Sequence, residues 1–392
     1  AVSNHILAEY FENLAQGYKD YGFIYSFSAS VMDRGMHTPE GYSEDALSHT
    51  VSHILGETAV AEESQNEIPS DGRQASIVPH TMTKTTAAIE TAIPTEPVTA
   101  EAPADPNERP NIICVLLESF VDPTEIQFLE LSEDPVPYFH SLGEQYTSGY
   151  LTVPVVGAGT ANTEFEVLTG MSMQFFGLGE YPYKTILKKT NCESIAADLS
   201  DLGYGTHVVH NNGGNFYSRR NAFSQMGFDT FTSKELMDIR EYTPLGTWPT
   251  DHILVGETQK AMDATPGQSD FVYMITVQGH GEYPSEPVLE APAVSVTGAE
   301  DEAADCRWEY YVNMIHEMDQ VIGELVEMLE QRDEKTIVVL FGDHLPTMGL
   351  REEDMASGSI FKTRYITWNN FGLEKHDADV TSYQLLFVFA IS

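Results

Sequence analysis

Thr336-Ile-Val-Val-Leu-Phe-Gly-Asp-His-Leu-Pro346 is the stretch that decides the fold of this 392-residue chain. Its continuous apolar run is typical of a strand buried on both faces of a parallel sheet. The run ends in Asp343 and His344, and ligands of open α/β sheets bind beyond the carboxyl ends of the strands. Just past a strand end, a carboxylate and an imidazole on adjacent residues can turn toward one ion. An Asp-His pair alone does not specify a site, so a second signal is needed.

A second strand has the same form. Asn111-Ile-Ile-Cys-Val-Leu-Leu117 is again apolar, and it delivers Glu118 at its end. From Asn111 onward strands and helices alternate, and the clearest helix, residues 305–331, carries one long apolar stripe. This alternation predicts an α/β fold with a mainly parallel central sheet flanked by helices.

The candidate nucleophile lies in Gly157-Ala-Gly-Thr-Ala-Asn-Thr-Glu-Phe-Glu-Val-Leu-Thr-Gly170, where Thr160 follows two glycines. The glycines let the backbone approach a bound group closely, and the first amides of the following helix favour an anion. That arrangement suits phosphoryl or sulfuryl transfer, whereas a structural turn with Thr160 as the helix N-cap is the alternative. Glu118 and the Asp343-His344 pair favour the catalytic interpretation, because two carboxylates, one imidazole and one Thr oxygen can form a metal site.

These motifs resemble the lipoteichoic acid synthase family, within the sulfatase and alkaline-phosphatase superfamily. The sulfatase signature has a nucleophile, three residues, a basic residue, three residues and then Leu-Thr-Gly, and Thr160, Glu164 and Leu168-Thr169-Gly170 occupy that frame. Thr in place of Cys or Ser, and Glu164 in place of the basic residue, speak against a sulfatase and match the phosphoglycerol transferases. The resemblance covers roughly residues 111–383 and implies a sulfatase-like fold.

The resemblance also implies individual site residues. The family's metal ligands fall on Glu118, Thr160, Asp343 and His344, with manganese the usual ion and magnesium a possible substitute. The positions that bind the phosphoglycerol substrate fall on His210, Asn212, Tyr217, Arg219 and His280. Asn212 stands where well-known members have Asp and Tyr217 where they have Trp, so the contacts to the glycerol hydroxyls can differ.

The residue types agree with that assignment, although alternatives exist. Arg219 offers a planar donor fork suited to phosphate oxygens, and a surface ion pair is its alternative. His280 follows an apolar strand at residues 271–277 and should reach the ligand edge of the sheet, unless it is a core or surface histidine. Three lysines near the nucleophile could recruit substrate or form a solvated basic run: Lys184, Lys188 and Lys189.

Charge and cysteine content exclude several classes of protein. A net charge of −40 rules out nonspecific affinity for nucleic acid, since binding a phosphate backbone needs clustered Lys and Arg. The same acidity repels anionic lipid head groups, so a phosphoglycerol substrate must be held by the metal and Arg219 locally. Three widely spaced cysteines argue against a zinc ribbon or a disulfide framework.

The chain divides into three predicted parts. Residues 1–56 form a membrane-proximal helical segment, and residues 57–110 form a disordered acidic linker rich in Thr, Pro and Ala. Residues 111–392 form the sulfatase-like catalytic domain, which stops where the family continues, so we expect a truncated C-terminus. No run approaches the roughly 18 apolar residues of a membrane helix, and the first residue is not Met. We therefore expect a membrane region to precede the chain.

The implied function is metal-dependent transfer of a glycerophosphate group from phosphatidylglycerol to a glycolipid, polyglycerolphosphate or teichoic acid acceptor, through a covalent Thr160 intermediate. The implied location is the extracellular face of a bacterial cell membrane, of Gram-positive type. Three alternatives stay open: a sulfatase or phosphodiesterase that hydrolyses a soluble ester, a phosphoethanolamine transferase, and a protein that binds glycerophosphate polymers without catalysis.

Overall fold

The computed structural model describes residue 43 and residues 109–177 and 179–386. The predicted N-terminal helical segment, the linker up to residue 108 and the last six residues lie outside the described part. Within the described ranges, no helix combines the length and the apolar character that a membrane span requires.

An eight-stranded sheet forms the centre of the described domain, with strand order β10-β3-β9-β8-β1-β6-β4-β5. The strands are β1 (Asn111–Leu117), β3 (Ser148–Thr152), β4 (Gly205–His210), β5 (Thr230–Ser233), β6 (Asp270–Ile275), β8 (Thr336–Gly342), β9 (Lys362–Asn369) and β10 (Val380–Thr381). β8, β1, β6, β4 and β5 are all parallel neighbours, whereas β9 runs antiparallel to both β8 and β3. The predicted mainly parallel sheet is confirmed.

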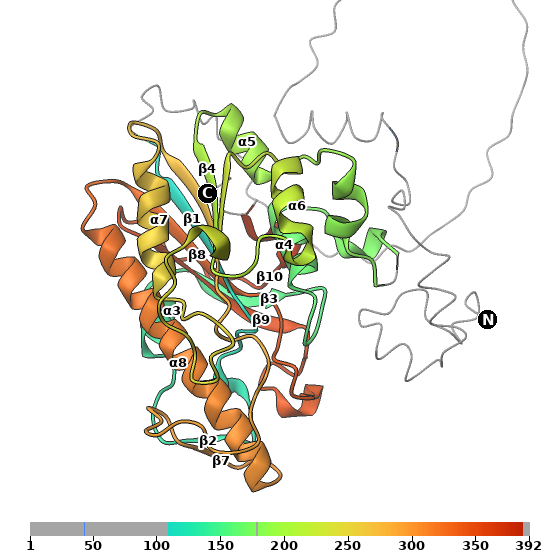
Figure 1. Cartoon of the computed structure of the whole chain (residues 1–392), viewed down its shortest axis with the longest axis vertical. Helices are drawn as coiled ribbons and strands as arrows, with labels where there is room; N and C mark the ends of the chain where they lie inside the picture. Colours follow the sequence, from blue (N-terminus) through green and yellow to red (C-terminus); the bar gives the residue numbers. More distant parts are fainter. Residues whose placement is uncertain (1–42, 44–108, 178, 387–392) are drawn as a thin grey trace, which may run out of the picture. The chain divides into compact units, whose positions relative to one another are not determined.

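Helices cover both faces of this sheet (Figure 1). They are α3 (Pro137–Gln145), α4 (Thr160–Thr169), α5 (Ile195–Asp201), α6 (Arg219–Gln225), α7 (Ile253–Asp263) and α8 (Glu302–Glu330). Residues Ile113, Val115 and Leu117 of β1 pack with α3, α7 and α8, while Cys114 and Leu116 pack with α4, α5 and α6. Successive β1 side chains therefore enter opposite cores, which explains why the strand is apolar throughout.

Short elements complete the domain. The strands β2 (Glu130–Leu131) and β7 (Val296–Thr297) form a separate antiparallel pair. The short 3₁₀ helices are η3 (Pro123–Glu125), η4 (Met173–Phe175), η5 (Pro182–Lys184), η6 (Ile186–Lys188), η7 (Phe216–Ser218), η8 (Lys234–Leu236), η9 (Glu352–Asp354) and η10 (Ser382–Gln384). Because β1, β4, β6 and β8 are parallel, the segments that follow them emerge at one edge of the sheet, which carries the candidate site.

Candidate active site

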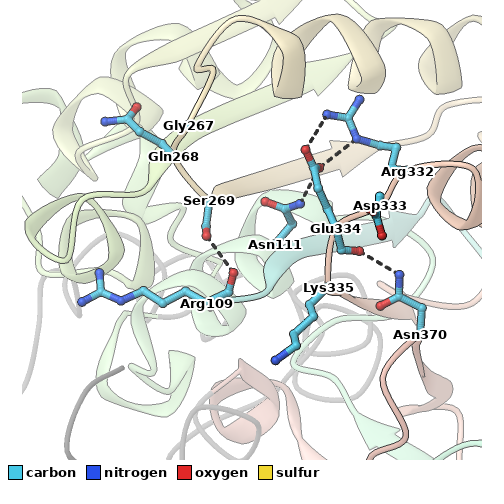
Figure 2. Close-up of a pocket in the computed structure, with 10 residues that line it drawn as sticks. All are labelled: Arg109, Asn111, Gly267, Gln268, Ser269, Arg332, Asp333, Glu334, Lys335 and Asn370. Atoms are coloured by element: carbon cyan, nitrogen blue, oxygen red, sulfur yellow. Dashed lines mark hydrogen bonds and ion pairs between the residues drawn. The ribbon is translucent and has the colours of Figure 1, made fainter. Parts of the chain in front are cut away.

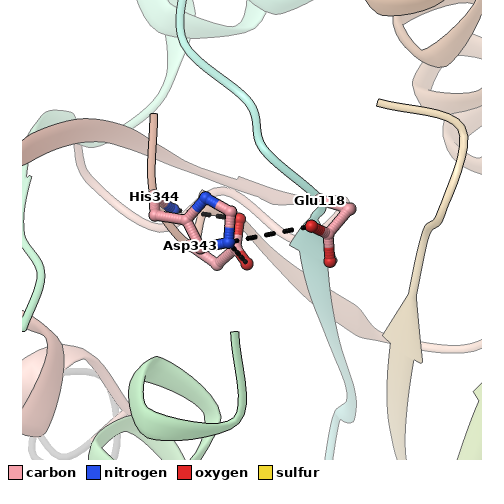
Figure 3. A group of neighbouring side chains, drawn as sticks. All are labelled: Glu118, Asp343 and His344. Carbon is pink, nitrogen blue, oxygen red and sulfur yellow. Dashed lines mark hydrogen bonds and ion pairs between the residues drawn. The ribbon is translucent and has the colours of Figure 1, made fainter. Parts of the chain in front are cut away.

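The ends of β1 and β8 bring three predicted metal ligands together. Oxygen and nitrogen atoms of Glu118, Asp343 and His344 lie within 4.8 Å of one another, and all three residues are buried. His344 Nε2 is 3.7 Å from Glu118 Oε1 and 3.2 Å from Asp343 Oδ2 (Figure 3). Two carboxylates and one imidazole suit a divalent cation such as Mn²⁺, Mg²⁺ or Zn²⁺, and this set does not choose among them.

Backbone and side-chain hydrogen bonds hold Glu118 and Asp343 in place. Ser119 has a left-handed backbone with φ of 55°, which turns the chain sharply after β1. Its N–H donates to Asp343 Oδ1 at 2.8 Å, and its hydroxyl donates to Glu118 Oε1 at 3.1 Å. The hydroxyls of Thr276 and Tyr311 fix the same turn, because Thr276 accepts from the Glu118 N–H and Tyr311 donates to the Ser119 carbonyl.

The Thr160 hydroxyl completes this group. Thr160 is the first residue of α4, directly after Gly159, whose φ of 102° favours glycine. Thr160 Oγ1 lies 3.1 Å from Glu118 Oε2 and 3.3 Å from His344 Nε2. The Nδ1–H of His344 donates to the Leu345 carbonyl, so the Nε2 atom faces the other ligands. The four residues predicted as ligands therefore form one cluster.

The electrostatics of the cluster favour a bound cation. Burial, with the Glu118 charge adding to it, raises the pKa of Asp343 to about 7. The Oδ2 atom of Asp343 is buried without a hydrogen-bond partner. Burial lowers the pKa of His344, but the charges of Asp343 and Glu118 outweigh burial and raise it. A divalent cation would satisfy the Asp343 oxygen and compensate two adjacent carboxylates, so the residues present fit such an ion.

Two further imidazoles present unpartnered nitrogens. His210 ends β4, and its Nδ1–H donates to the Ile275 carbonyl at 2.9 Å. Burial lowers the pKa of His210 well below its usual range, and the charges of Arg219 and His280 lower it further. His210 is therefore neutral, with a lone pair on Nε2. His210 Nε2 and His280 Nδ1 are both buried without a hydrogen-bond partner among the described residues. These atoms can contact a bound phosphate or its glycerol.

Arg219 makes an ion pair that is buried and not at the surface. Arg219 is only 1% exposed, and its Nε and Nη2 atoms donate to Glu164 Oε1 at 3.0 and 2.5 Å. Tyr183 donates to the other Glu164 oxygen at 3.0 Å. One edge of the Arg219 guanidinium therefore faces Glu164. Glu164 occupies the position at which the sulfatase signature has a basic residue. The Nη1 amino group takes no part in these bonds.

The remaining two predicted substrate residues lie on the same segment. The side-chain Oδ1 of Asn212 accepts from the Gly213 N–H at 2.7 Å, which makes a local turn. Tyr217 has a left-handed backbone with φ of 53°, and its ring stacks on Tyr181 at 5.3 Å. The Arg219 guanidinium lies 5.3 Å from the Tyr217 ring centre. A strained non-glycine residue beside a candidate site is a common feature of ligand-binding segments.

One structural residue of the site was missed by the sequence analysis. Asp251 is fully buried, and burial raises its pKa to about 6. Its carboxylate accepts from Asn211 Nδ2 at 2.8 Å and from the N–H groups of Val277 and Gln278 at 2.9 and 3.0 Å. Asp251 therefore joins the loop after His210 to the loop before His280. It lies in an irregular loop without apolar pattern, so no sequence signal marks it.

A separate depression of about 470 Å³ lies at the opposite edge of the sheet, before β1, β6 and β8 (Figure 2). Glu334 is already occupied within this depression, since it pairs with Arg332 and accepts a hydrogen bond from the Asn111 amide. The depression holds none of the predicted site residues, and its lining offers no nucleophile beside a base. The candidate site therefore remains at the edge that carries Glu118 and Asp343.

Residues 110–387 match the family model described as Sulfatase. A curated Rhizobium meliloti protein named for cyclic beta-1,2-glucan modification is 32% identical over 240 residues, which are 61% of this chain and 36% of that protein. An uncharacterized Haemophilus influenzae protein is 24% identical over 255 residues, 60% of this chain and 44% of its own length. The chain thus spans less than half the length of these curated relatives.

Solved structures share the fold. The Streptococcus pyogenes phosphoglycerol transferase GacH, in complex with sn-glycerol-1-phosphate, has a TM-score of 0.62 at 22% identity, covering 73% of this chain and 74% of that one. The lipoteichoic acid synthase LtaP from Listeria monocytogenes has a TM-score of 0.57 at 18% identity, covering 72% and 71%. At these identities the likeness establishes architecture, and chemistry must be argued from the site.

Proposed function

The chain belongs to the sulfatase family, and from that premise we propose that it is a metal-dependent phosphoglycerol transferase that uses Thr160 as its nucleophile. The donor is phosphatidylglycerol, and the acceptor is a hydroxyl group of a glycolipid or a polyglycerolphosphate chain. The observation that carries the proposal is the position of Thr160 Oγ1, within 3.3 Å of both Glu118 and His344 in a buried ligand cluster.

The residues of this chain divide the work of the first step. Glu118, Thr160, Asp343 and His344 would hold a divalent ion, Mn²⁺ or alternatively Mg²⁺, which when bound would acidify the Thr160 hydroxyl and offset phosphoryl charge. Thr160 Oγ1 attacks the phosphorus, and its proton passes to the Glu118 oxygen at 3.1 Å. A new P–O bond to Thr160 forms while the bond to diacylglycerol breaks, and diacylglycerol leaves after taking up a proton.

The second step reverses the first with a different alcohol. An acceptor hydroxyl attacks the glycerophospho-threonine and gives its proton to Glu118, while the bond from phosphorus to Thr160 Oγ1 breaks and Oγ1 takes a proton back. The free nitrogens of His210 and His280 and the Nη1 group of Arg219 supply polar contacts to phosphoryl and glycerol oxygens. Asn212 and Tyr217 are assigned to the glycerol end of the site. Because the ligand group is buried, water is restricted there, which favours transfer over hydrolysis.

The acceptor has a second candidate, supported by a specific comparison. The Rhizobium meliloti relative, at 32% identity, is named for modification of a cyclic glucan. A sugar hydroxyl is an alcohol of the same reactivity as a glycerol hydroxyl, so the Thr160 intermediate can serve either. We propose a carbohydrate hydroxyl as the alternative acceptor. With a membrane lipid as donor, we propose that the domain works at the extracellular face of the cell membrane.

Peptide mass spectrometry tests the proposal directly. The protein is incubated with Mn²⁺ and phosphatidylglycerol, without acceptor, and the Thr160 peptide is fragmented. A mass increase of one glycerophosphoryl unit on Thr160, together with released diacylglycerol, is the expected result. Parallel incubation with phosphatidylethanolamine tests the phosphoethanolamine alternative, which predicts a phosphoethanolamine adduct instead.

Two variants serve as controls for this experiment. Thr160→Ala should abolish the adduct and diacylglycerol release while leaving the fold intact, and Thr160→Ser should retain a hydroxyl and part of the activity. Retained turnover in Thr160→Ala, or an adduct on Thr163 in place of Thr160, would refute the nucleophile assignment. Hydrolysis of a sulfate ester in preference to reaction with phosphatidylglycerol would support sulfatase activity and contradict the transferase proposal.

A further inference from the structure

Two segments of this acidic chain carry only positive charge. Residues 181–192 and 211–228 contain Lys184, Lys188, Lys189, Arg219 and Arg220 and no Asp or Glu. The whole chain has 20 Lys and Arg against 60 Asp and Glu, so these 30 residues hold a quarter of the cations and none of the acids. These two segments therefore carry a net positive charge, whereas the rest of the chain is strongly acidic.

The structure packs the two segments against each other. η5 and η6 of the first segment contact η7 and α6 of the second. Lys184 Nζ lies 5.0 Å from the ring centre of Tyr181 and 4.8 Å from that of Tyr217. The amide of Asn221 donates to the Leu187 carbonyl, which ties α6 to η6. Residues separated by about 30 positions in the sequence therefore form one surface.

The exposed groups of this surface are cationic and aromatic. Lys184, Lys188, Lys189 and Arg220 are exposed, and the Phe216 ring is 46% exposed. We call these five residues the cationic face. Among the described residues, none of its four cations makes an ion pair within 4 Å of a carboxylate, although Arg220 lowers the pKa of nearby Glu235 as a minor contributor after hydrogen bonds.

Buried contacts connect the cationic face to the candidate active site. Arg219 begins α6 beside Arg220, and its guanidinium lies 5.8 Å from the Phe216 ring centre. The same guanidinium pairs with Glu164, which is one turn after Thr160 in α4. A partner held on the cationic face would therefore lie close to the helix that begins with the candidate nucleophile.

We propose that the cationic face docks the catalytic domain onto an anionic lipid bilayer, so that the site opens toward the membrane surface. The inference rests on the proposed function, in which the donor is an anionic membrane lipid. Lysines around an exposed Phe are the combination that binds an interface, because the ring enters the headgroup region while the cations face anionic lipids. At physiological salt the Debye length is about 8 Å, so the acids elsewhere on the chain are screened from the contact.

The net charge of the whole chain and the charge of the cationic face act on anionic lipids at different distances. The overall value of −40 predicts repulsion of anionic lipids, and that repulsion acts on the chain at long range in dilute buffer. At contact distance only the facing residues count, and here the four cations outnumber the one acid noted beside them, Glu235. Binding to anionic vesicles should therefore be weak at very low salt, strengthen toward physiological salt and fall again at high salt.

Vesicle sedimentation with the full chain tests the docking. Vesicles of phosphatidylcholine containing phosphatidylglycerol are compared with phosphatidylcholine alone. The variant Lys188→Gln/Lys189→Gln removes two charges that touch none of the proposed catalytic residues, and it should weaken partitioning onto anionic vesicles roughly 30-fold. The matched control is Lys260→Gln/Lys335→Gln, which removes the same charge near the amino ends of the strands (Lys335 is labelled in Figure 2) and should bind like the parent.

Turnover separates docking from chemistry. On a short-chain phosphatidylglycerol that stays monomeric, Lys188→Gln/Lys189→Gln should equal the parent, whereas on vesicles its rate should fall with its binding. Thr160→Ala should bind vesicles like the parent even though it transfers nothing, so a failed transferase assignment leaves the docking result standing. Unchanged vesicle binding in the lysine variant would overturn the proposal. The proposal would also be overturned if the lysine variant lost as much turnover on the monomeric donor as on vesicles. A variant that lost only its affinity for a soluble polyglycerolphosphate acceptor would overturn it as well.

Discussion

Removal of the Glu164 carboxylate should destabilise the domain through Arg219. Both side chains are essentially inaccessible to solvent, at 0% and 2% exposure, and they are joined by donors at 2.5 and 3.0 Å. Burial opposes the charge of Arg219, but Glu164 more than compensates and raises its pKa, so the guanidinium stays charged. Glu164→Gln keeps the shape of the side chain and leaves that charge without a counter-ion.

The magnitude follows from the burial. Breaking a buried ion pair by removal of one partner costs about 3–5 kcal/mol, because the remaining charge is uncompensated. For a domain of this size, each kcal/mol lowers the melting temperature by roughly 2–4 °C, so Glu164→Gln should lose about 6–20 °C. The hydroxyl of Tyr183 still finds an amide oxygen as acceptor, which keeps the expected loss toward the lower end.

A double-mutant cycle measured by urea unfolding provides the assay. Glu164→Gln, Arg219→Met and the double variant are compared with the parent, and the double variant should lose several kcal/mol less than the sum of the single losses. Asp238→Asn is the surface control, since Asp238 and its partner Arg240 are both exposed, and its unfolding midpoint should stay close to that of the parent. A Glu164→Gln loss below about 1 kcal/mol, or additive single losses, would refute the argument that the pair is a buried, mutually dependent unit.

Three more measurements follow from the structure. Chelation of divalent metal should lower the melting temperature and abolish transfer. Mn²⁺ at 100 times its dissociation constant should then raise the free energy of unfolding by about 2.7 kcal/mol, and Asp343→Asn should not show this gain. Asp251→Asn should reduce kcat/KM about 10- to 100-fold, because Asp251 holds the loops that carry His210 and His280. Asp319→Asn is the matched control, since Asp319 is equally buried but accepts hydrogen bonds from N–H groups of α3. This control should lose stability and keep the kcat/KM of the parent. The Asp122 hydrogen bond raises the pKa of His140 to about 9, above its usual 6.5. That stabilisation is complete below pH 6.5 and is lost as pH rises through 9, so the unfolding midpoint of the parent should fall across this window more than that of His140→Gln.

The parallel half of the fold was predictable from sequence because each strand carries its own signal. β1 and β8 are continuous apolar runs, and α8 begins only three residues before the predicted residue 305. The antiparallel half gives no such signal. β3 is the short polar-rich stretch Ser148–Thr152, and it becomes a strand through pairing with β9, more than 200 residues away. Tertiary pairing, and not local propensity, places that part of the sheet.

The candidate site shows the same division between local and distant information. Glu118, Asp343 and His344 stand directly after predictable strands, so parallel topology alone predicts that they meet. The bonds that orient them come from Ser119 and Thr276, the latter 158 positions from its partner, and no pattern in a single sequence marks such a contact. The metal identity and the roles of the five predicted substrate residues remain predictions.

Charge balance connects Glu164 to the need for a metal. In the sulfatase signature a basic residue occupies this position, whereas here an acid does, and the cation arrives from Arg219 in a different segment. In the protonation state that would bind a metal, both ligand carboxylates are ionised and His344 is neutral, so Glu118, Asp343, Glu164 and Arg219 together carry two negative charges in a buried space. A phosphodiester would then meet net repulsion, because the positive charge of Arg219 is already matched by Glu164. In the proposed mechanism a divalent cation would bring this group to neutrality, so the metal, and not Arg219, would supply the positive charge that admits the phosphoryl group.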